Sequence, residues 1–291
     1  MKISIFGSAG LLGEALVRFY RDAGHDVRGY TRSDVDLNDA VALQLLLDRD
    51  ESDLILNPSG MTGLEGCLDN QAEAQRVNVV APAAMAKSCA EKGIPFVHFS
   101  TDYVFGGDED RYLSESDKTN PVSDYGQTKL DGELSVLEAM PTALVCRVSW
   151  LFGFARRSFV DQVMNHAQQG TTQAYISDKF SVPNFADDLA SMCAQLVDKH
   201  ARGVVHLCSN GGEVTWYSYA QEVIEQMSKL GLIKSSEGLI TESNLDDVAA
   251  FRAKRPRYTS MLSVRMVEEY GVSSTNWREG LKRFLTEKSK P

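Results

Sequence analysis

The sequence predicts a doubly wound α/β domain built on a parallel sheet, followed by a smaller C-terminal lobe. Short runs rich in Val, Ile and Leu alternate with helical patterns over residues 1–150, and a glycine-rich turn joins the first run to the first helix. Beyond residue 150 this alternation becomes irregular. Strands joined by helices form parallel sheets that are covered on both faces, and such strands are apolar along their whole length.

The expected elements follow one another along the chain. Strands are predicted where short apolar runs occur, at 3–6, 25–30, 53–57, 94–100 and 142–150. Helices are predicted where apolar residues recur every three or four positions, at 11–20, 40–47, 72–91 and 123–138. Later helices are expected at 157–167, 187–201 and 216–230, with one more strand at 203–209. The stretch 231–262 is polar and irregular.

Composition and charge exclude several classes of protein. The chain has 291 residues, of which 43% are hydrophobic and 24% charged, as in a globular protein of about two domains. Forty acidic and 30 basic residues give a net charge of −10, so we expect no nucleic-acid or membrane partner. No apolar run approaches the roughly 18 residues of a membrane span. The N-terminus is expected to be a buried strand and not a signal peptide.

The cysteines and histidines indicate neither a disulfide framework nor a metal site. The five cysteines are odd in number and widely spaced, and the five histidines form no pair at a ligand spacing. We therefore expect free buried thiols in a reducing, cytoplasmic compartment, and we expect no metal.

The glycine-rich turn at residues 7–13 (GSAGLLG) predicts a dinucleotide site and hence a Rossmann-type domain. Glycines let the backbone approach a pyrophosphate, and the helix that follows offers free N–H groups to it. Glycine is common in turns, so the context of strand, turn and helix is what gives the motif its force. The expected cofactor contacts in this turn are Gly7, Ser8, Gly10, Leu11, Leu12 and Gly13.

The end of the second strand bears on the choice of cofactor. A carboxylate there usually binds the ribose 2′-OH, whereas an arginine accommodates a 2′-phosphate. Arg32 lies at this end and no acid occurs before Asp34, so we predict NADP(H), with NAD(H) left open. Arg32 could also be a solvated loop residue. Asp36 and Leu37 are placed on the adenine side.

Tyr125 and Lys129 are four residues apart and share one face of a predicted helix. An ammonium beside a phenol lowers the pKa of the phenol, which can then protonate a developing alkoxide. The spacing alone occurs often by chance. It gains force from Ser100 and Thr101 at the tip of the preceding strand, because a hydroxyl there can polarise a substrate carbonyl.

Taken together, these motifs resemble the extended short-chain dehydrogenase/reductase superfamily and, within it, the dTDP-4-dehydrorhamnose reductase family. The resemblance rests on the glycine turn and on STDYVFGG (100–107), YGQTKLDGE (125–133), RVSWLFG (147–153) and TWYSYA (215–220). It continues through RPRYTSML (255–262) and NWREGL (276–281), and so covers almost the whole chain.

The resemblance implies an NADPH-dependent reduction of the 4-keto group of a nucleotide-activated 6-deoxyhexose, first of all dTDP-4-dehydrorhamnose to dTDP-L-rhamnose. It implies residues 1–150 as the cofactor domain, rejoined by a strand and helices from 186–230, and residues 151–291 as mainly the substrate lobe. A homodimer is one assembly that it allows. The catalytic residues that it implies are Thr101, Tyr125 and Lys129. Asn57 and Asn78 match positions near the cofactor ribose and the active-site helix.

On the substrate side the resemblance implies Asp102, Tyr103, Trp150 and Arg255. Arg255 belongs to a basic cluster at 252–257, which is either an anion clamp for the pyrophosphate or a solvated loop. If Arg255 is not the clamp, Arg156 or Arg157 is the next candidate.

Two other functions stay open from the sequence. One is an epimerase or dehydratase acting on a similar sugar nucleotide, and the other is a non-catalytic regulatory subunit of the methionine adenosyltransferase β type. Departures from the family pattern at residues 57–61, Ser181, Asn184 and Leu262 leave the sugar and the base undetermined.

Overall fold

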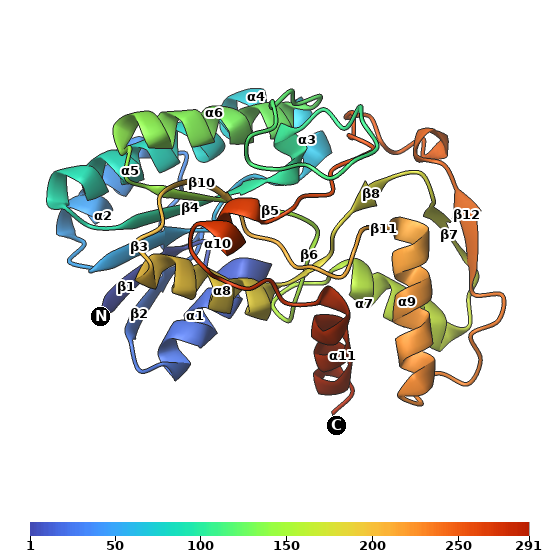
Figure 1. Cartoon of the computed structure of the whole chain (residues 1–291). Helices are drawn as coiled ribbons and strands as arrows, with labels where there is room; N and C mark the ends of the chain where they lie inside the picture. Colours follow the sequence, from blue (N-terminus) through green and yellow to red (C-terminus); the bar gives the residue numbers. More distant parts are fainter. Residues whose placement is uncertain (291) are drawn as a thin grey trace.

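A single parallel sheet of six strands forms the centre of the larger domain (Figure 1). The computed structural model describes residues 1–290. The strand order is β10-β5-β4-β3-β1-β2, so the direction of winding reverses between β1 and β3. The strands are β1 (Lys2–Phe6), β2 (Asp26–Tyr30), β3 (Leu54–Asn57), β4 (Phe96–Thr101), β5 (Leu144–Val148) and β10 (Gly203–His206). The predicted doubly wound parallel α/β fold is confirmed.

The central strands β3, β4 and β5 form because most of their side chains are apolar and both of their faces are covered. Every residue of β3, β4 and β5 is buried, and each face packs against a separate hydrophobic core. On one face lie α1 (Leu11–Asp22), α8 (Ala186–Asp198) and the short α10 (Val264–Glu268). On the other lie α2 (Ala40–Arg49), α5 (Ala81–Lys92) and α6 (Asp124–Ala139) (Figure 1).

The ends of these helices follow local sequence signals. Asp39 caps α2 by accepting hydrogen bonds from the backbone N–H groups of Val41 and Ala42. Ser123 caps α6 through Gly126 N–H, and α5 ends at Gly93, which has the left-handed φ of 69° that favours glycine. The site on α6 is therefore held in place by its own N-cap.

The single helix predicted over 72–91 is wrong in detail. The chain instead forms α3 (Leu64–Asp69), α4 (Gln71–Gln75) and a π-helical turn (Arg76–Val80) that leads into α5. Within the turn, the amide of Asn78 hydrogen-bonds to both backbone polar groups of Met61 and to Thr128 Oγ1. These contacts come from distant segments, and π turns commonly occur where a helix serves a site.

The small lobe consists of helices around an aromatic core. Its helices are α7 (Phe159–Gln169), α9 (Trp216–Lys229) and α11 (Trp277–Lys288). Its short strands pair as β6 (Leu151–Phe152) with β9 (Asn184–Phe185), β7 (Gln173–Ile176) with β12 (Ile240–Ser243), and β8 (Phe180–Ser181) with β11 (Val214–Thr215). The helix predicted over 216–230 is α9, which packs here against α7 and β7. Strand β10 and helix α8 lie on the large sheet.

Two short 3-10 turns lie at Asp102–Val104 and at Leu245–Asp247. The five cysteines are free and buried. Within residues 1–290, no helix has the length and apolar character needed to cross a bilayer.

Candidate active site

A cavity of about 510 Å³ opens where the strands β1 to β5 end at their carboxyl termini. In open α/β sheets this edge is where ligands bind, close to the point at which the strand order reverses. Of the predicted site residues, the cavity wall contains Gly7, Gly10, Leu11, Leu12, Arg32, Asp36, Leu37, Ser100, Tyr125 and Lys129. The structure therefore brings the glycine turn and the Tyr/Lys helix to one hollow.

The glycine turn needs glycine at two positions for steric reasons. Gly7 has a φ of +79°, and a Cβ there would lie 2.7 Å from the Cα of Ser59. A Cβ on Gly13 would lie 2.1 Å from the carbonyl oxygen of Gly7. Helix α1 starts after Gly10 with no side chain capping its first turn, so its N–H groups remain available to an anion.

Arg32 lies at the rim of the cavity with 77% of its side chain exposed, and it forms an ion pair with Glu73 of α4 at 3.1 Å. A 2′-phosphate placed there would compete with Glu73 for the guanidinium. Asp36 is held within its own loop by the backbone and side-chain amides of Asn38, and these hydrogen bonds lower its pKa. It therefore stays ionised at the wall of the cavity.

Lys129 is almost fully buried beneath the cavity floor. Its Nζ donates to the carbonyl oxygen of Phe99 at 2.6 Å and lies 3.5 Å from Nε2 of His98. Burial lowers the pKa of Lys129 to about 8, while Glu133 opposes that shift. The ring of His98 also contacts the amide of Asn57 at 3.2 Å, which places Asn57 one contact away from the lysine.

Burial raises the pKa of the Tyr125 phenol above its ordinary value. We expected the ammonium of Lys129 to lower the pKa of the phenol, but burial dominates and raises it, and the hydrogen bond with Thr101 offsets only part of that rise. A phenol that stays protonated is suited to donate a proton and is a poor base. The acid role predicted for Tyr125 is compatible with this environment.

Two further glycines set the position of α6, and the sequence pattern did not single them out. A Cβ on Gly126 would lie 2.2 Å from the carbonyl oxygen of Tyr103, and one on Gly132 would lie 2.2 Å from that of Asn78. Both glycines thus let α6 approach the backbone that carries site residues. Gly126 lies three residues before Lys129 and Gly132 three residues after it, and this spacing is the sequence signal that could have identified them.

At the tip of β4, Thr101 is buried and forms local hydrogen bonds. Its Oγ1 donates to Asp102 Oδ1 at 3.1 Å and accepts from the N–H of Tyr103 at 3.3 Å. The neighbouring Ser100 lines the cavity, and its buried Oγ has no hydrogen-bond partner within the described chain. An unpaired buried hydroxyl facing a cavity fits a site that takes a polar ligand.

None of the four residues predicted on the substrate side is in the wall of this cavity, and they lie in different places. The ring of Tyr103 packs edge-on against Tyr125 at a centroid distance of 5.7 Å, with Asp102 buried beside it. Trp150 is absent from the cavity wall and packs in the small lobe, where its ring lies 4.9 Å from that of Tyr219. Its φ of 41° is unusual for a residue other than glycine.

The side chain of Arg255 forms a contact between the two lobes. Its side chain is 8% exposed, its Nη2 lies 2.9 Å from Glu65 of α3, and its guanidinium stacks on Phe251 at 3.5 Å. Elsewhere in the basic cluster, Arg252 pairs with Asp69 of α3. A phosphate clamp at Arg255 would have to exchange Glu65 for the ligand. The alternative Arg156 lines the cofactor cavity.

Within residues 1–290 there is no group of three or more His, Cys, Asp or Glu side chains placed to hold a metal ion.

Comparisons with known proteins agree over the whole chain. A family model described as the RmlD substrate binding domain matches residues 1–290. The probable low-salt glycan biosynthesis reductase Agl14 of Haloferax volcanii is 33% identical, with 95% of each chain covered. The dTDP-4-dehydrorhamnose reductase of Salmonella typhimurium is 29% identical over 99% of this chain and 98% of its own. A crystal structure of a dTDP-4-dehydrorhamnose reductase from Clostridium acetobutylicum superposes with a TM-score of 0.91 at 26% identity, and 100% of both chains is covered.

Proposed function

Because the chain belongs to the RmlD substrate binding domain family, we propose that it is an NADPH-dependent reductase of nucleotide-activated 4-keto-6-deoxyhexoses. The substrate that we propose first is dTDP-4-dehydrorhamnose, which would give dTDP-L-rhamnose. The observation that carries the proposal is the meeting of Tyr125 and Lys129 with the glycine turn in one cavity, beside Thr101. A protein that only bound nucleotide would not need a buried acid and a buried amine at this edge.

The residues present fit a dinucleotide with a nicotinamide ring. The free N–H groups at the start of α1 suit a pyrophosphate, and the unpaired hydroxyl of Ser100 offers a further polar contact in the cavity. When bound, the reduced nicotinamide supplies a hydride to the carbonyl carbon. We propose NADPH in preference to NADH because Arg32 lies at the rim of the cavity beyond the end of β2, where an arginine would accommodate a 2′-phosphate.

The chain's own residues would handle the proton and the carbonyl oxygen. Tyr125 holds its proton and would donate it to the oxygen as negative charge develops there. Thr101 would donate a hydrogen bond to the same oxygen and so polarise the carbonyl. Lys129, buried and anchored to Phe99, would hold its ammonium below the phenol and the cofactor ribose.

A dehydratase is disfavoured by the residue that follows Thr101-Asp102. Dehydratases that resemble this family carry a glutamate at that position, which removes a proton from carbon. Here the position is Tyr103, whose pKa is raised by burial and by the nearby Asp102. A neutral phenol with so high a pKa is a poor base for a carbon acid.

The deciding experiment measures NADPH oxidation by the purified protein against a panel of dTDP-, UDP- and GDP-linked 4-keto sugars. Reduction of at least one of them, lost in Tyr125→Phe, is the expected result. NADPH binding with no turnover on any member of the panel would favour a regulatory subunit instead. We also propose a cytoplasmic location, which the five free thiols support. A homodimer is proposed on the resemblance alone.

A further inference from the structure

The wall of the cavity contains an arginine that the proposed chemistry does not yet use. Arg156 lines the cavity together with Gly10 and Leu11 of the glycine turn. It is exposed, and in the described part of the chain it forms neither an ion pair nor a side-chain hydrogen bond. Arg32, the other arginine of the wall, already pairs with Glu73. Arg156 can therefore bind an anion without first giving up a carboxylate partner.

The segment that carries Arg156 lies against the start of α1. The segment follows β6, and a Cβ on Gly153 would lie 3.6 Å from Cδ2 of Leu11. The guanidinium of Arg18, also on α1, lies over the ring of Phe154 at 5.3 Å from its centre. Two consecutive residues of the segment thus contact α1, and Arg156 follows two positions later.

The small lobe fixes the same segment from its other side. The ring of Phe154 packs on that of Phe284 of α11 at a centroid distance of 5.1 Å. Ser158, at the start of α7, donates to Asp161 Oδ2 from its backbone N–H at 2.8 Å and from its hydroxyl at 2.7 Å. Arg156 lies between these two anchors, so its backbone is held at the cavity while its long side chain stays exposed.

Arg32 and Arg156 reach the glycine turn from opposite sides. In the sheet, β2 lies on one side of β1, and β3, β4 and β5 lie on the other. Arg32 follows β2, whereas Arg156 follows β5 and β6. The glycine turn and the uncapped start of α1 follow β1 and so lie between them. The β2 side is where a ribose 2′-phosphate binds, which leaves Arg156 as the arginine for the pyrophosphate.

A pyrophosphate in this cavity needs a cation besides the N–H groups of α1. The chain has a net charge of −10, and the cavity wall itself includes Asp36 and Glu73. The forked donors of a guanidinium match the oxygens of a phosphate better than a point charge does. The unpaired hydroxyl of Ser100, a residue that is 3% exposed, independently marks the same wall as one that takes a polar ligand.

We propose that Arg156 binds the pyrophosphate of the dinucleotide cofactor from the side of the small lobe. Its guanidinium adds a charged contact to the N–H groups at the start of α1. NADPH and NADH both contain the pyrophosphate, so Arg156 strengthens the binding of both and does not select between them. This inference rests on the proposed function only for the class of cofactor. It gives Arg156 to the cofactor and not to the sugar nucleotide, for which it was the alternative to Arg255.

The experiment measures the binding of NADPH, NADH and ADP-ribose to the full chain by titration calorimetry, without turnover. ADP-ribose contains the pyrophosphate but neither the nicotinamide nor the 2′-phosphate. We expect Arg156→Ala to raise all three Kd values by a similar factor of about tenfold, the lower end of the range for a charge-assisted contact because the residue is exposed. Arg156→Lys should recover part of this loss. The affinity of the wild type should fall more steeply with salt than that of Arg156→Ala.

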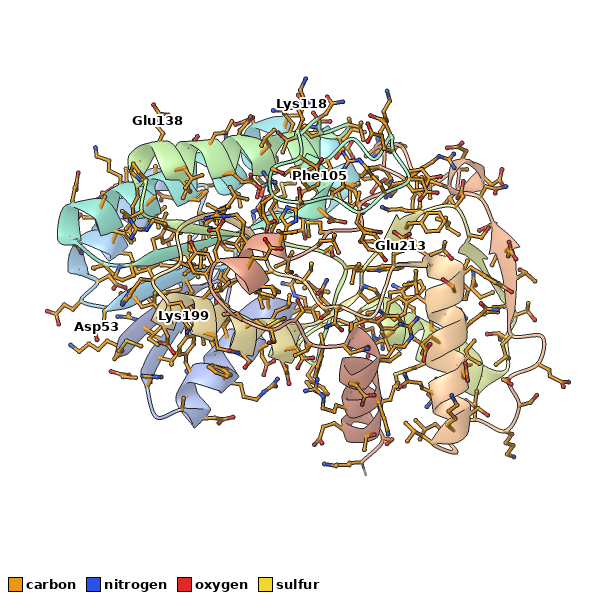
Figure 2. All side chains as sticks on the ribbon, in the orientation of Figure 1. Asp53, Phe105, Lys118, Glu138, Lys199 and Glu213 are labelled. Carbon is orange, nitrogen blue, oxygen red and sulfur yellow. The ribbon has the colours of Figure 1, made fainter. Side chains whose placement is uncertain are left out.

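Two control variants separate a contact from a change in net charge. Arg157→Ala is the matched control, because Arg157 is the exposed neighbour of Arg156 and is absent from the cavity wall. Lys199→Ala removes an exposed positive charge at the end of α8 (Figure 2). Both should bind the three ligands as the wild type does. Arg32→Ala gives the contrasting pattern, since it should weaken NADPH and leave NADH and ADP-ribose unchanged.

Three results overturn the role of Arg156. One is a Kd for ADP-ribose that is the same in Arg156→Ala as in the wild type. Another is a loss confined to NADPH, which would place Arg156 at the 2′-phosphate. The third is a higher KM for the sugar nucleotide with every cofactor Kd unchanged, which would make it a substrate residue.

The binding measurements keep this inference separate from the proposed function. A wild type that binds the dinucleotides but reduces no keto sugar overturns the proposed function, and the expected losses in Arg156→Ala would still support the role of Arg156. A wild type that binds none of the three ligands overturns both.

Discussion

Replacing Tyr125 with Phe removes one hydroxyl from the centre of the site and keeps the ring. The ring still packs against Tyr103, and Thr101 keeps its hydrogen bonds to Asp102 and to the N–H of Tyr103. No buried polar atom loses its last partner, so the free energy of unfolding should fall by less than about 1 kcal/mol. The rate should respond far more, because a positioned acid contributes about 10²–10⁴, or about 2.7–5.4 kcal/mol.

The assay is the steady-state rate of NADPH oxidation with a 4-keto sugar nucleotide, alongside NADPH binding followed by fluorescence and thermal unfolding. We expect kcat to fall about 10²–10⁴-fold while the Kd for NADPH stays near the wild-type value. Tyr270→Phe is the matched control. The Tyr270 hydroxyl donates to the carbonyl oxygen of Arg202, which directly precedes β10 at the amino ends of the strands, whereas the cavity lies at their carboxyl ends. Reduction by Tyr125→Phe at the wild-type rate would refute the assignment of the acid.

Four further outcomes are expected. Arg32→Ala should remove most of the preference for NADPH over NADH, about ten- to a hundredfold, and equal kcat/KM for both cofactors in the wild type would contradict the role of Arg32. Arg255→Ala should raise the KM for the sugar nucleotide about tenfold and leave NADPH binding unchanged. A variant in which only the KM for NADPH rises would contradict the role of Arg255 in binding the sugar nucleotide. The rate should decline as the pH rises through about 8, where Lys129 loses its proton. A rate that stays constant up to pH 10 would contradict a role for the Lys129 ammonium. Incubation with dTDP-glucose should give no 4-keto product, because the neutral phenol of Tyr103 is too weak a base to remove a proton from carbon. Appearance of the alkaline chromophore of that product would contradict this expectation.

The parts of the site that local sequence determines were predictable. The glycine turn follows from strand, turn and helix in succession, and its steric need is seen at Gly7 and Gly13. Tyr125 and Lys129 share a helix face because of their four-residue spacing. The doubly wound parallel sheet followed from the alternation of apolar runs and helices, since helical crossovers join parallel strands.

The parts that depend on contacts between distant segments were not predictable. The π turn at Arg76–Val80 is tied to hydrogen bonds between Asn78, Met61 and Thr128, and nothing in its own sequence marks it. Two-residue strands such as Leu151–Phe152 are too short to show a period. The raised pKa of Tyr125 required knowing its burial, because the spacing to a lysine gives only the sign of a charge effect.

The ion pair that Arg255 already forms limits how much this residue can contribute to substrate affinity. A charge-assisted contact to a phosphate is worth about 1.5–3 kcal/mol, but Arg255 already has a partner in Glu65. Glu65 is 32% exposed, so the pair that must be given up is screened and worth about 0–1 kcal/mol. The difference is about 0.5–3 kcal/mol, a range that includes the roughly tenfold rise in KM expected for Arg255→Ala. Exchange of Glu65 for a ligand phosphate would remove one of the two ion pairs that join the segment at 251–258 to α3, and the pair between Arg252 and Asp69 would remain to hold that segment in place.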